Sequence, residues 1–536
     1  MLVLLASIAI VAGDLQLVSA QSRTSAAAAS TPFAIAESDI AGLQAQMRDG
    51  TLSSHALTQA YLDRIAAIDD AGPRLNAVIE LNPDALAEAD ARDAERKAGK
   101  LRGPLHGIPM LLKDNIDVTP MVNSAGSLAL ADHHPKTDAF LVQRLRQAGA
   151  VILGKTNLSE WANFRSSRST SGWSGRGGQT KSPYALDRNP CGSSAGTGSA
   201  IAANLATVGI GTETDGSIIC PSAVAGLVGI KPTVGLVSRS GIIPISHSQD
   251  TAGPMARSVA DAATLLAAIA GRDDADSATT QAGRPSAPDY LTHLKADALK
   301  GARIGVVRKL MDYQPDVDAA MESAIAAMKA AGAEVVDAQI TTAGQWDDAE
   351  LQVLLYEFKA DLEKYLAGSN ASIKTLAGLI EFNKQHAATE MPYFGQELFA
   401  QAQAKGPLTD KAYIQARAKA RRLAGPEGID AALKAQHLDA LVAPSMSPAW
   451  LTDPVNGDHF TGAGYGVAAV AGTPSITVPM GDSHGLPLGI VFMGPAWSEP
   501  RLIELGYAFE QRTKARRAPQ FLPTVSLQTP PATTAK

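Results

Sequence analysis

A glycine- and serine-rich region near the middle of the chain holds residue types that could do nucleophilic chemistry. Residues 191–199 read CGSSAGTGS, and residues 212–217 read TETDGS. An apolar run separates the two pieces, so the pattern predicts a helix that starts at the glycines, then a strand, then a polar turn that carries a serine. Such a turn could present a nucleophilic hydroxyl beside backbone N–H donors, although a glycine loop without chemistry would have the same composition.

Two motif matches in this part of the chain predict other chemistries, and their context argues against both. Residues 149–156, GAVILGKT, fit the phosphate-loop pattern, but the four variable positions are apolar and predict a buried strand. Residues 192–196, GSSAG, fit the G-x-S-x-G elbow, which would make Ser194 the nucleophile. That elbow must follow a strand, whereas residues 181–191 are polar and include two prolines. We therefore expect neither a nucleotide site nor an elbow serine.

The ten histidines and two cysteines do not show the spacing of a metal site. His133 and His134 are adjacent and cannot share one helix face, and no H-E-x-x-H pattern occurs. Cys191 and Cys220 flank the serine-rich region, and either a disulfide or two buried thiols would fit the sequence. We expect chemistry without a metal, a cofactor or a histidine base.

The serine region, taken together with an upstream lysine, resembles the amidase-signature enzymes. The matching stretches are GPLHGIPMLLKDN at 103–115 and the run from CGSSAGTGS through GTETDGSIICPS to GIKPT at 191–233. The resemblance extends over nearly the whole chain. It implies that Lys113 is the base, Ser193 the proton relay and Ser217 the nucleophile. It also implies an oxyanion hole made of the backbone N–H groups of Thr214, Asp215, Gly216 and Ser217.

A lysine can act as this base only if it is buried. The ordinary pKa of a lysine is about 10.4, and burial can lower it by about three units. Lys113 follows the apolar run 108–112, which predicts a buried strand. The hydroxyl of Ser193 would then take the proton of Ser217 and pass its own proton to Lys113.

The implied reaction is hydrolysis of a carboxamide to a carboxylate and ammonia through an acyl-enzyme. The stretches at 163–194 and 211–218 are similar to those of bacterial peptide amidases, which favours peptide C-terminal amides as substrates. Glu213, Asp215 and Ile219 stand where many family members have Asp, Gly and Arg. Two alternatives remain, namely an amidase for small or aryl amides and a non-catalytic periplasmic peptide-binding protein.

The elements expected to position these residues form one α/β domain over residues 32–518. Apolar residues at helical spacing follow Ser38, short apolar runs at 108–113 and 150–153 predict strands, and residues 301–340 read as strand, helix, strand. Residues 342–425 predict helices that cover a sheet. We expect a mixed, mostly parallel β-sheet covered by helices, the fold that the family resemblance also implies.

The first residues of the chain predict export, and the last residues predict a frayed tail. Residues 2–12 are apolar and Val18-Ser19-Ala20 resembles a cleavage site, so we expect a signal peptide at 1–20, a linker at 21–31 and a periplasmic or secreted protein. The Pro/Thr-rich residues 519–536 are expected to fray.

Among the 536 residues, Lys and Arg number 47 and Asp and Glu 53, and no basic run is interleaved with aromatics, so we expect no nucleic-acid partner. We also expect no membrane association after signal cleavage, and the oligomeric state stays open.

Overall fold

The structure, a computed structural model, describes residues 33–281, 283–286 and 289–525. The described residues from Glu37 onward form one compact unit. The expected signal peptide and linker lie outside the described residues, so export stays a prediction. Within the described residues, no helix is both long enough and apolar enough to cross a bilayer.

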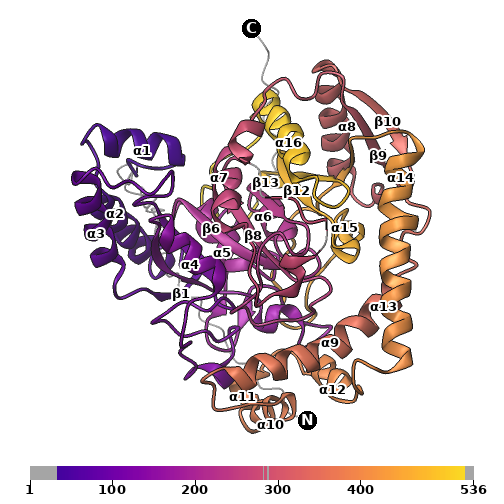
Figure 1. The fold of residues 1–536 in the computed structure, drawn as a ribbon, viewed down its shortest axis with the longest axis horizontal. Helices are drawn as coiled ribbons and strands as arrows, with labels where there is room; N and C mark the ends of the chain where they lie inside the picture. Colours follow the sequence, from indigo (N-terminus) through magenta and orange to yellow (C-terminus); the bar gives the residue numbers. More distant parts are fainter. Residues whose placement is uncertain (1–32, 282, 287–288, 526–536) are drawn as a thin grey trace, which may run out of the picture. The chain divides into compact units, whose positions relative to one another are not determined.

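An 11-stranded sheet runs through the large unit (Figure 1). A separate two-stranded hairpin of β4 (Trp173–Ser174) and β5 (Gly178–Gln179) lies outside it. The strands of the large sheet, in spatial order, are β1 (Val78–Leu81), β3 (Val151–Thr156), β2 (Pro109–Lys113), β6 (Val208–Glu213), β8 (Thr251–Ala256), β7 (Val228–Lys231), β12 (Ser475–Ser483), β13 (Leu486–Met493), β11 (Ala440–Pro444), β9 (Arg303–Val307) and β10 (Glu334–Ala338).

The sheet is mixed, as expected, and its parallel pairs fall into two groups. Strand β2 is parallel to both β3 and β6, and β9 is parallel to both β10 and β11. The other neighbours in the sheet are antiparallel. Parallel pairing is thus less extensive than the sequence suggested. Strands β12 and β13 show why, since only two residues join them and so short a turn permits an antiparallel hairpin alone.

Sixteen α-helices occur in the described part of the chain, and α9 to α12 pack against one another (Figure 1). They are α1 (Ile40–Arg48), α2 (Ser54–Arg64), α3 (Ala85–Lys97), α4 (Phe140–Gln147), α5 (Ala195–Ala202), α6 (Ile219–Val224), α7 (Val259–Ile269), α8 (Pro315–Ala330), α9 (Asp347–Gly368), α10 (Leu376–Gln385), α11 (Ala387–Glu390), α12 (Glu397–Gln403), α13 (Lys411–Ala424), α14 (Asp430–Ala435), α15 (Gly466–Ala471) and α16 (Glu499–Thr513).

Helix α5 explains the glycine-rich stretch in structural terms. All of its residues are buried, and it contacts β2, β3, β6 and β8. A Cβ atom on Gly196 would overlap the backbone of Ala77 and Asn157. The small side chains therefore let this helix lie deep in the unit, directly after Ser193 and Ser194.

Most of the elements expected from the sequence are present. The helices after Ser38 are α1 and α2, the run 150–153 belongs to β3, and the strand, helix, strand unit is β9, α8 and β10. Every residue of β3 is buried, so the phosphate-loop match is a strand inside the sheet. No strand directly precedes Ser194.

The expected fraying from Pro519 is wrong for the first residues of that tail. Phe521 donates its backbone N–H to the Pro183 carbonyl at 2.9 Å, and Leu186 donates to the Leu522 carbonyl at 2.8 Å. Backbone hydrogen bonds therefore hold residues 521 and 522 against the segment that leads to the serines. The Pro/Thr composition did not reveal this pairing, because the partner is more than 300 positions away in sequence.

Candidate active site

Lys113 is the last residue of β2, and its side chain is completely buried. Its Nζ lies 2.7 Å from Ser193 Oγ. It also lies 2.8 Å from Thr212 Oγ1 and 3.2 Å from the Thr212 carbonyl oxygen. Thr212 sits near the end of β6, which is parallel to β2 and beside it, so the carboxyl ends of the two strands bring these groups together.

Burial lowers the pKa of Lys113 to about 7, although the nearby carboxyl groups of Glu213 and Asp250 act in the opposite direction. A substantial fraction of the amine is therefore neutral near pH 7. With two of its hydrogens on the Thr212 oxygens, the lone pair of the neutral amine faces Ser193 Oγ.

Ser193 and Ser194 differ in what their hydroxyl groups contact. Ser193 follows a cis Gly192–Ser193 peptide, contacts Lys113 and lines a cavity with Ser217. Ser194 is fully buried, and its Oγ donates to the Thr212 carbonyl at 3.1 Å and accepts from the Thr212 N–H at 3.2 Å. The Ser194 hydroxyl thus ties the start of α5 to the end of β6.

The turn after β6 presents Ser217 at the cavity. Gly216 has φ +80°, and a Cβ atom there would overlap the ring of Tyr465, so both conformation and space require glycine. The Glu213 carboxylate accepts hydrogen bonds from the N–H groups of Ile218 and Ile219, and the Gly216 N–H contributes to the same carboxylate. Among the described residues, the N–H groups of 214, 215 and 217 have no hydrogen-bond partner.

Asp250 connects this turn to the loop that lines the cavity, residues 239–250. Its Oδ1 accepts from Thr214 Oγ1 at 2.6 Å, and its Oδ2 accepts from the N–H groups of Ile245 and Ser246 at 2.8 Å. The charge of Asp250 also raises the pKa of Lys113. One carboxyl group therefore both holds the turn in place and affects the protonation of the lysine.

A disulfide joins Cys191 to Cys220, with their Cα atoms 6.1 Å apart. This settles the pairing that the sequence left open. Cys191 precedes Ser193 by two positions, and Cys220 follows Ser217 by three. The bond therefore links the segments that carry the two serines.

Two cavities meet at Ser217. One, of about 360 Å³, is lined by Ser193, Ser217, Thr212, the 239–250 loop and part of α9. The other, of about 220 Å³, also reaches Ser217 and has Asp215 on its wall. Its aromatic walls are Phe164, Trp450, Phe460 and Tyr465. Ser217 thus lines both cavities.

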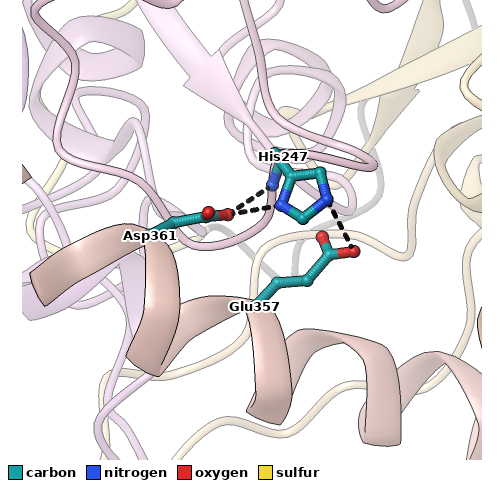
Figure 2. A group of neighbouring side chains, drawn as sticks. All are labelled: His247, Glu357 and Asp361. Atoms are coloured by element: carbon teal, nitrogen blue, oxygen red, sulfur yellow. Dashed lines mark hydrogen bonds and ion pairs between the residues drawn. The ribbon is translucent and has the colours of Figure 1, made fainter. Parts of the chain in front are cut away.

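His247, Glu357 and Asp361 form a cluster at the wall of the larger cavity. Figure 2 shows the imidazole between the two carboxylates of α9. The His247 Nδ1 lies 2.8 Å from Asp361 Oδ2, and Nε2 lies 3.3 Å from Glu357 Oε1. Glu357 also accepts hydrogen bonds from Ser246, Ser248 and Tyr413.

These three side chains are the group in the described residues that could hold a metal ion. Their contacts argue against that use, because the two carboxylates face opposite ring nitrogens and Glu357 already has several donors. A metal could replace only one of these contacts at a time. The cluster instead fastens the 239–250 loop to α9.

Sequence reasoning did not find Asp250, His247 or the residues of α9 that line the cavity. Each lies outside the serine-rich motif, and Glu357 and Asp361 are more than 100 positions from His247. Single acidic residues on a long polar helix look the same whether they face solvent or a histidine. No local signal could have identified them.

Comparisons with known proteins agree with this arrangement. The family model for amidases matches residues 56–503. A solved structure of native peptide amidase from Stenotrophomonas maltophilia is 61% identical, with a TM-score of 0.89 over 91% of this chain and 100% of that chain. The structure of an amidase family protein from Bacillus anthracis is 36% identical, with a TM-score of 0.82 over 91% of this chain and 93% of that chain. A probable amidase of Arabidopsis thaliana, At4g34880, is 40% identical over 510 residues, which cover 92% of this chain and 93% of the relative.

The chain therefore belongs to the amidase family, and its α/β unit has the fold of amidase-signature structures. It is a hydrolase that acts on amide C–N bonds. The family resemblance found from the sequence motifs is confirmed.

The His247 cluster predicts a pH-dependent contribution to stability. Burial alone would lower the pKa of His247, but the hydrogen bond and charge of Asp361, with Glu357, raise it above its ordinary value. The stabilisation is then complete below about pH 6.5, the pKa of an unfolded histidine, and is lost as the pH rises through the folded-state pKa. We expect His247→Gln to lower the Tm by roughly 1–3 °C at pH 6 and to change it little at pH 9.

The matched control is His134→Gln, since His134 is exposed and its imidazole is hydrogen-bonded to the neutral Pro120 carbonyl. It should leave the Tm unchanged at both pH values. Differential scanning calorimetry of both variants makes the comparison. An equal loss of Tm at pH 6 and pH 9 in His247→Gln would show that the cluster acts through packing rather than charge.

Proposed function

We propose that the protein hydrolyses carboxamides with Ser217 as nucleophile, Ser193 as proton relay and Lys113 as base. The observation that carries this proposal is the 2.7 Å contact between a buried, partly neutral lysine and Ser193, on the cavity that also contains Ser217. No metal or cofactor enters the proposed chemistry.

In the first half of the reaction, Ser217 Oγ attacks the amide carbonyl carbon. Its proton moves to Ser193 Oγ, while Ser193 gives its own proton to neutral Lys113. The backbone N–H groups of Thr214, Asp215 and Ser217, with a smaller share from Gly216, stabilise the oxyanion. Ser193 then gives a proton to the nitrogen and regains one from protonated Lys113. The C–N bond breaks, ammonia leaves, and an ester remains on Ser217.

In the second half, a water molecule attacks that ester. Lys113 takes the water proton through Ser193, a second tetrahedral oxyanion forms at the same donors, and the C–O bond to Ser217 breaks. The proton passes back to Ser217 Oγ, so the lysine is neutral again. The products are a carboxylic acid and the free enzyme.

For the substrate, we propose peptides that end in a C-terminal amide. Two features support this choice: the 61% identity to a peptide amidase over 91% of the chain, and the smaller cavity beside Ser217. Aromatic walls suit an amino-acid side chain, and the Asp215 carboxyl on the wall of the same cavity can accept a peptide N–H. Small and aryl amides remain the alternative substrates. The family assignment removes the alternative of a non-catalytic binding protein.

The choice of serine can be tested by covalent labelling. We expect a fluorophosphonate to modify Ser217, because it alone lies at a turn with backbone donors that can hold a phosphoryl oxygen. Ser217→Ala should abolish labelling, and both Ser217→Ala and Ser193→Ala should lower kcat by roughly 10³-fold or more.

Ser194→Ala is the control, and it should retain labelling at Ser217 with a smaller loss of activity. Peptide mass spectrometry locates the adduct. A label on Ser194 would overturn the assignment of the nucleophile.

The lysine base predicts a particular pH profile. Protonated Lys113 has no lone pair to accept a proton, so kcat/KM for an amide should rise with pH through an apparent pKa near 7 and then level off. Lys113→Ala should lower kcat/KM by roughly 10³-fold or more at every pH. Lys364→Ala removes an exposed lysine from the cavity wall and should keep the wild-type midpoint. A wild-type kcat/KM that stays constant between pH 5 and pH 9 would contradict the assignment of Lys113 as the base.

The substrate proposal predicts exo-acting deamidation. A long peptide amide should release one equivalent of ammonia and gain only the mass of the amide-to-acid conversion, with its internal peptide bonds intact. Ammonia assays and mass spectrometry of the same sample measure both. Internal fragments, or higher kcat/KM for acetamide or acetanilide than for peptide amides, would move the substrate to another class.

A further inference from the structure

Asn115 has a buried polar atom that the proposed mechanism does not use. It follows Lys113 by two positions and is only 4% exposed. Its Nδ2 donates to Thr212 Oγ1 at 3.0 Å, whereas its Oδ1 has no hydrogen-bond partner within the described residues. Turning the amide over would exchange the two atoms and still leave one of them unpartnered.

The backbone holds Asn115 in place. Its carbonyl accepts from the Ile243 N–H at 2.8 Å, and the Ile116 N–H donates to the Lys113 carbonyl at 3.1 Å. The side chain lines the same cavity as Ser193 and Ser217. A buried acceptor without a partner is unfavourable, so its position on the wall of a reaction cavity indicates a ligand that brings a donor.

The contacts around Thr212 place this acceptor near the proton relay. Thr212 Oγ1 is bonded to Asn115 on one side and, at 2.8 Å, to Lys113 Nζ on the other. Lys113 Nζ in turn lies 2.7 Å from Ser193 Oγ. The leaving nitrogen must come within hydrogen-bond distance of Ser193 Oγ to receive its proton, which brings it to this part of the cavity.

We infer that Asn115 Oδ1 accepts a hydrogen bond from the leaving nitrogen of a primary amide and holds it for protonation by Ser193. This inference rests on the proposed roles of Ser193 and Ser217. A primary amide nitrogen has two hydrogens of its own, and one of them is donated to Asn115. The third hydrogen comes from Ser193 as the C–N bond breaks, so the product is ammonia and the electron pair of that bond stays on nitrogen.

Asn115 thereby distinguishes amides from esters. The leaving oxygen of a methyl ester has no hydrogen to donate, so it cannot form a hydrogen bond with Asn115 Oδ1. Removing the acceptor should therefore slow acylation by an amide and spare acylation by the ester of the same acid.

The test compares kcat/KM for N-acetyl-alanyl-phenylalaninamide and for the matching methyl ester, since kcat/KM reports only the steps up to the acyl-enzyme. We expect Asn115→Ala to lower the value for the amide about 10- to 100-fold and the value for the ester less than threefold. Asn115→Asp keeps an acceptor and should recover part of the amide rate. It also serves as the second variant if Asn115→Ala does not fold.

Thr212→Val is the matched control, because Thr212 contacts Lys113 and should affect both substrates together. An equal loss for amide and ester in Asn115→Ala would mean that Asn115 holds a water molecule or supports the fold, and would overturn the inference. No loss for either substrate would overturn it as well. If wild-type enzyme releases no ammonia from the amide, or Ser217→Ala retains activity, then the proposed function itself fails.

Discussion

The removal of the Lys113 side chain from water is the constraint on which the rest of the site depends. A lysine in solvent would be protonated near neutral pH and could not accept a proton. Burial moves its pKa to about 7, while Glu213 and Asp250 limit the shift. The hydrogen bonds to Thr212 then satisfy the amine inside the protein. A site with more water would keep the lysine protonated, and a site with fewer polar partners would not tolerate the buried amine.

The topology of the sheet provides this environment. Strands β2 and β6 are parallel neighbours, so Lys113 and Thr212 emerge at the same edge of the sheet. The turn that carries Ser217 follows β6 directly, and α5 begins just after Ser193. The end of β2 thus provides the proposed base, and the segment from Ser193 through α5 and β6 to the following turn provides the proposed relay, the acceptors on Thr212 and the proposed nucleophile. The rest of the wall of the larger cavity comes from α9 and the 239–250 loop. His247 connects the loop to the helix through its contacts with Glu357 and Asp361.

The sequence predicted the part of the site that is local and missed the part that is not. The continuous motifs contain Lys113, Ser193 and Ser217. The apolar runs beside these residues allowed β2, β3 and α5 to be predicted. The absence of a strand directly before Ser194 was also predicted from the sequence and is confirmed. In contrast, the contacts of Asp250 and Glu357 arise from tertiary packing between distant segments. The share of antiparallel pairing was missed for the same reason, since strand periodicity does not specify which strand becomes the neighbour.

The disulfide has a consequence for the chain as a polymer. The segment from Cys191 to Cys220 contains Ser193, α5, β6 and Ser217, and the bond closes this segment into a covalent ring. The proposed nucleophile and relay therefore belong to one macrocycle, and its two ends cannot diffuse apart even when the surrounding sheet unfolds. A closed ring has fewer conformations to search than an open chain of equal length. The segment that contains both serines is thus restrained in part by its covalent bonds, independently of the packing around it.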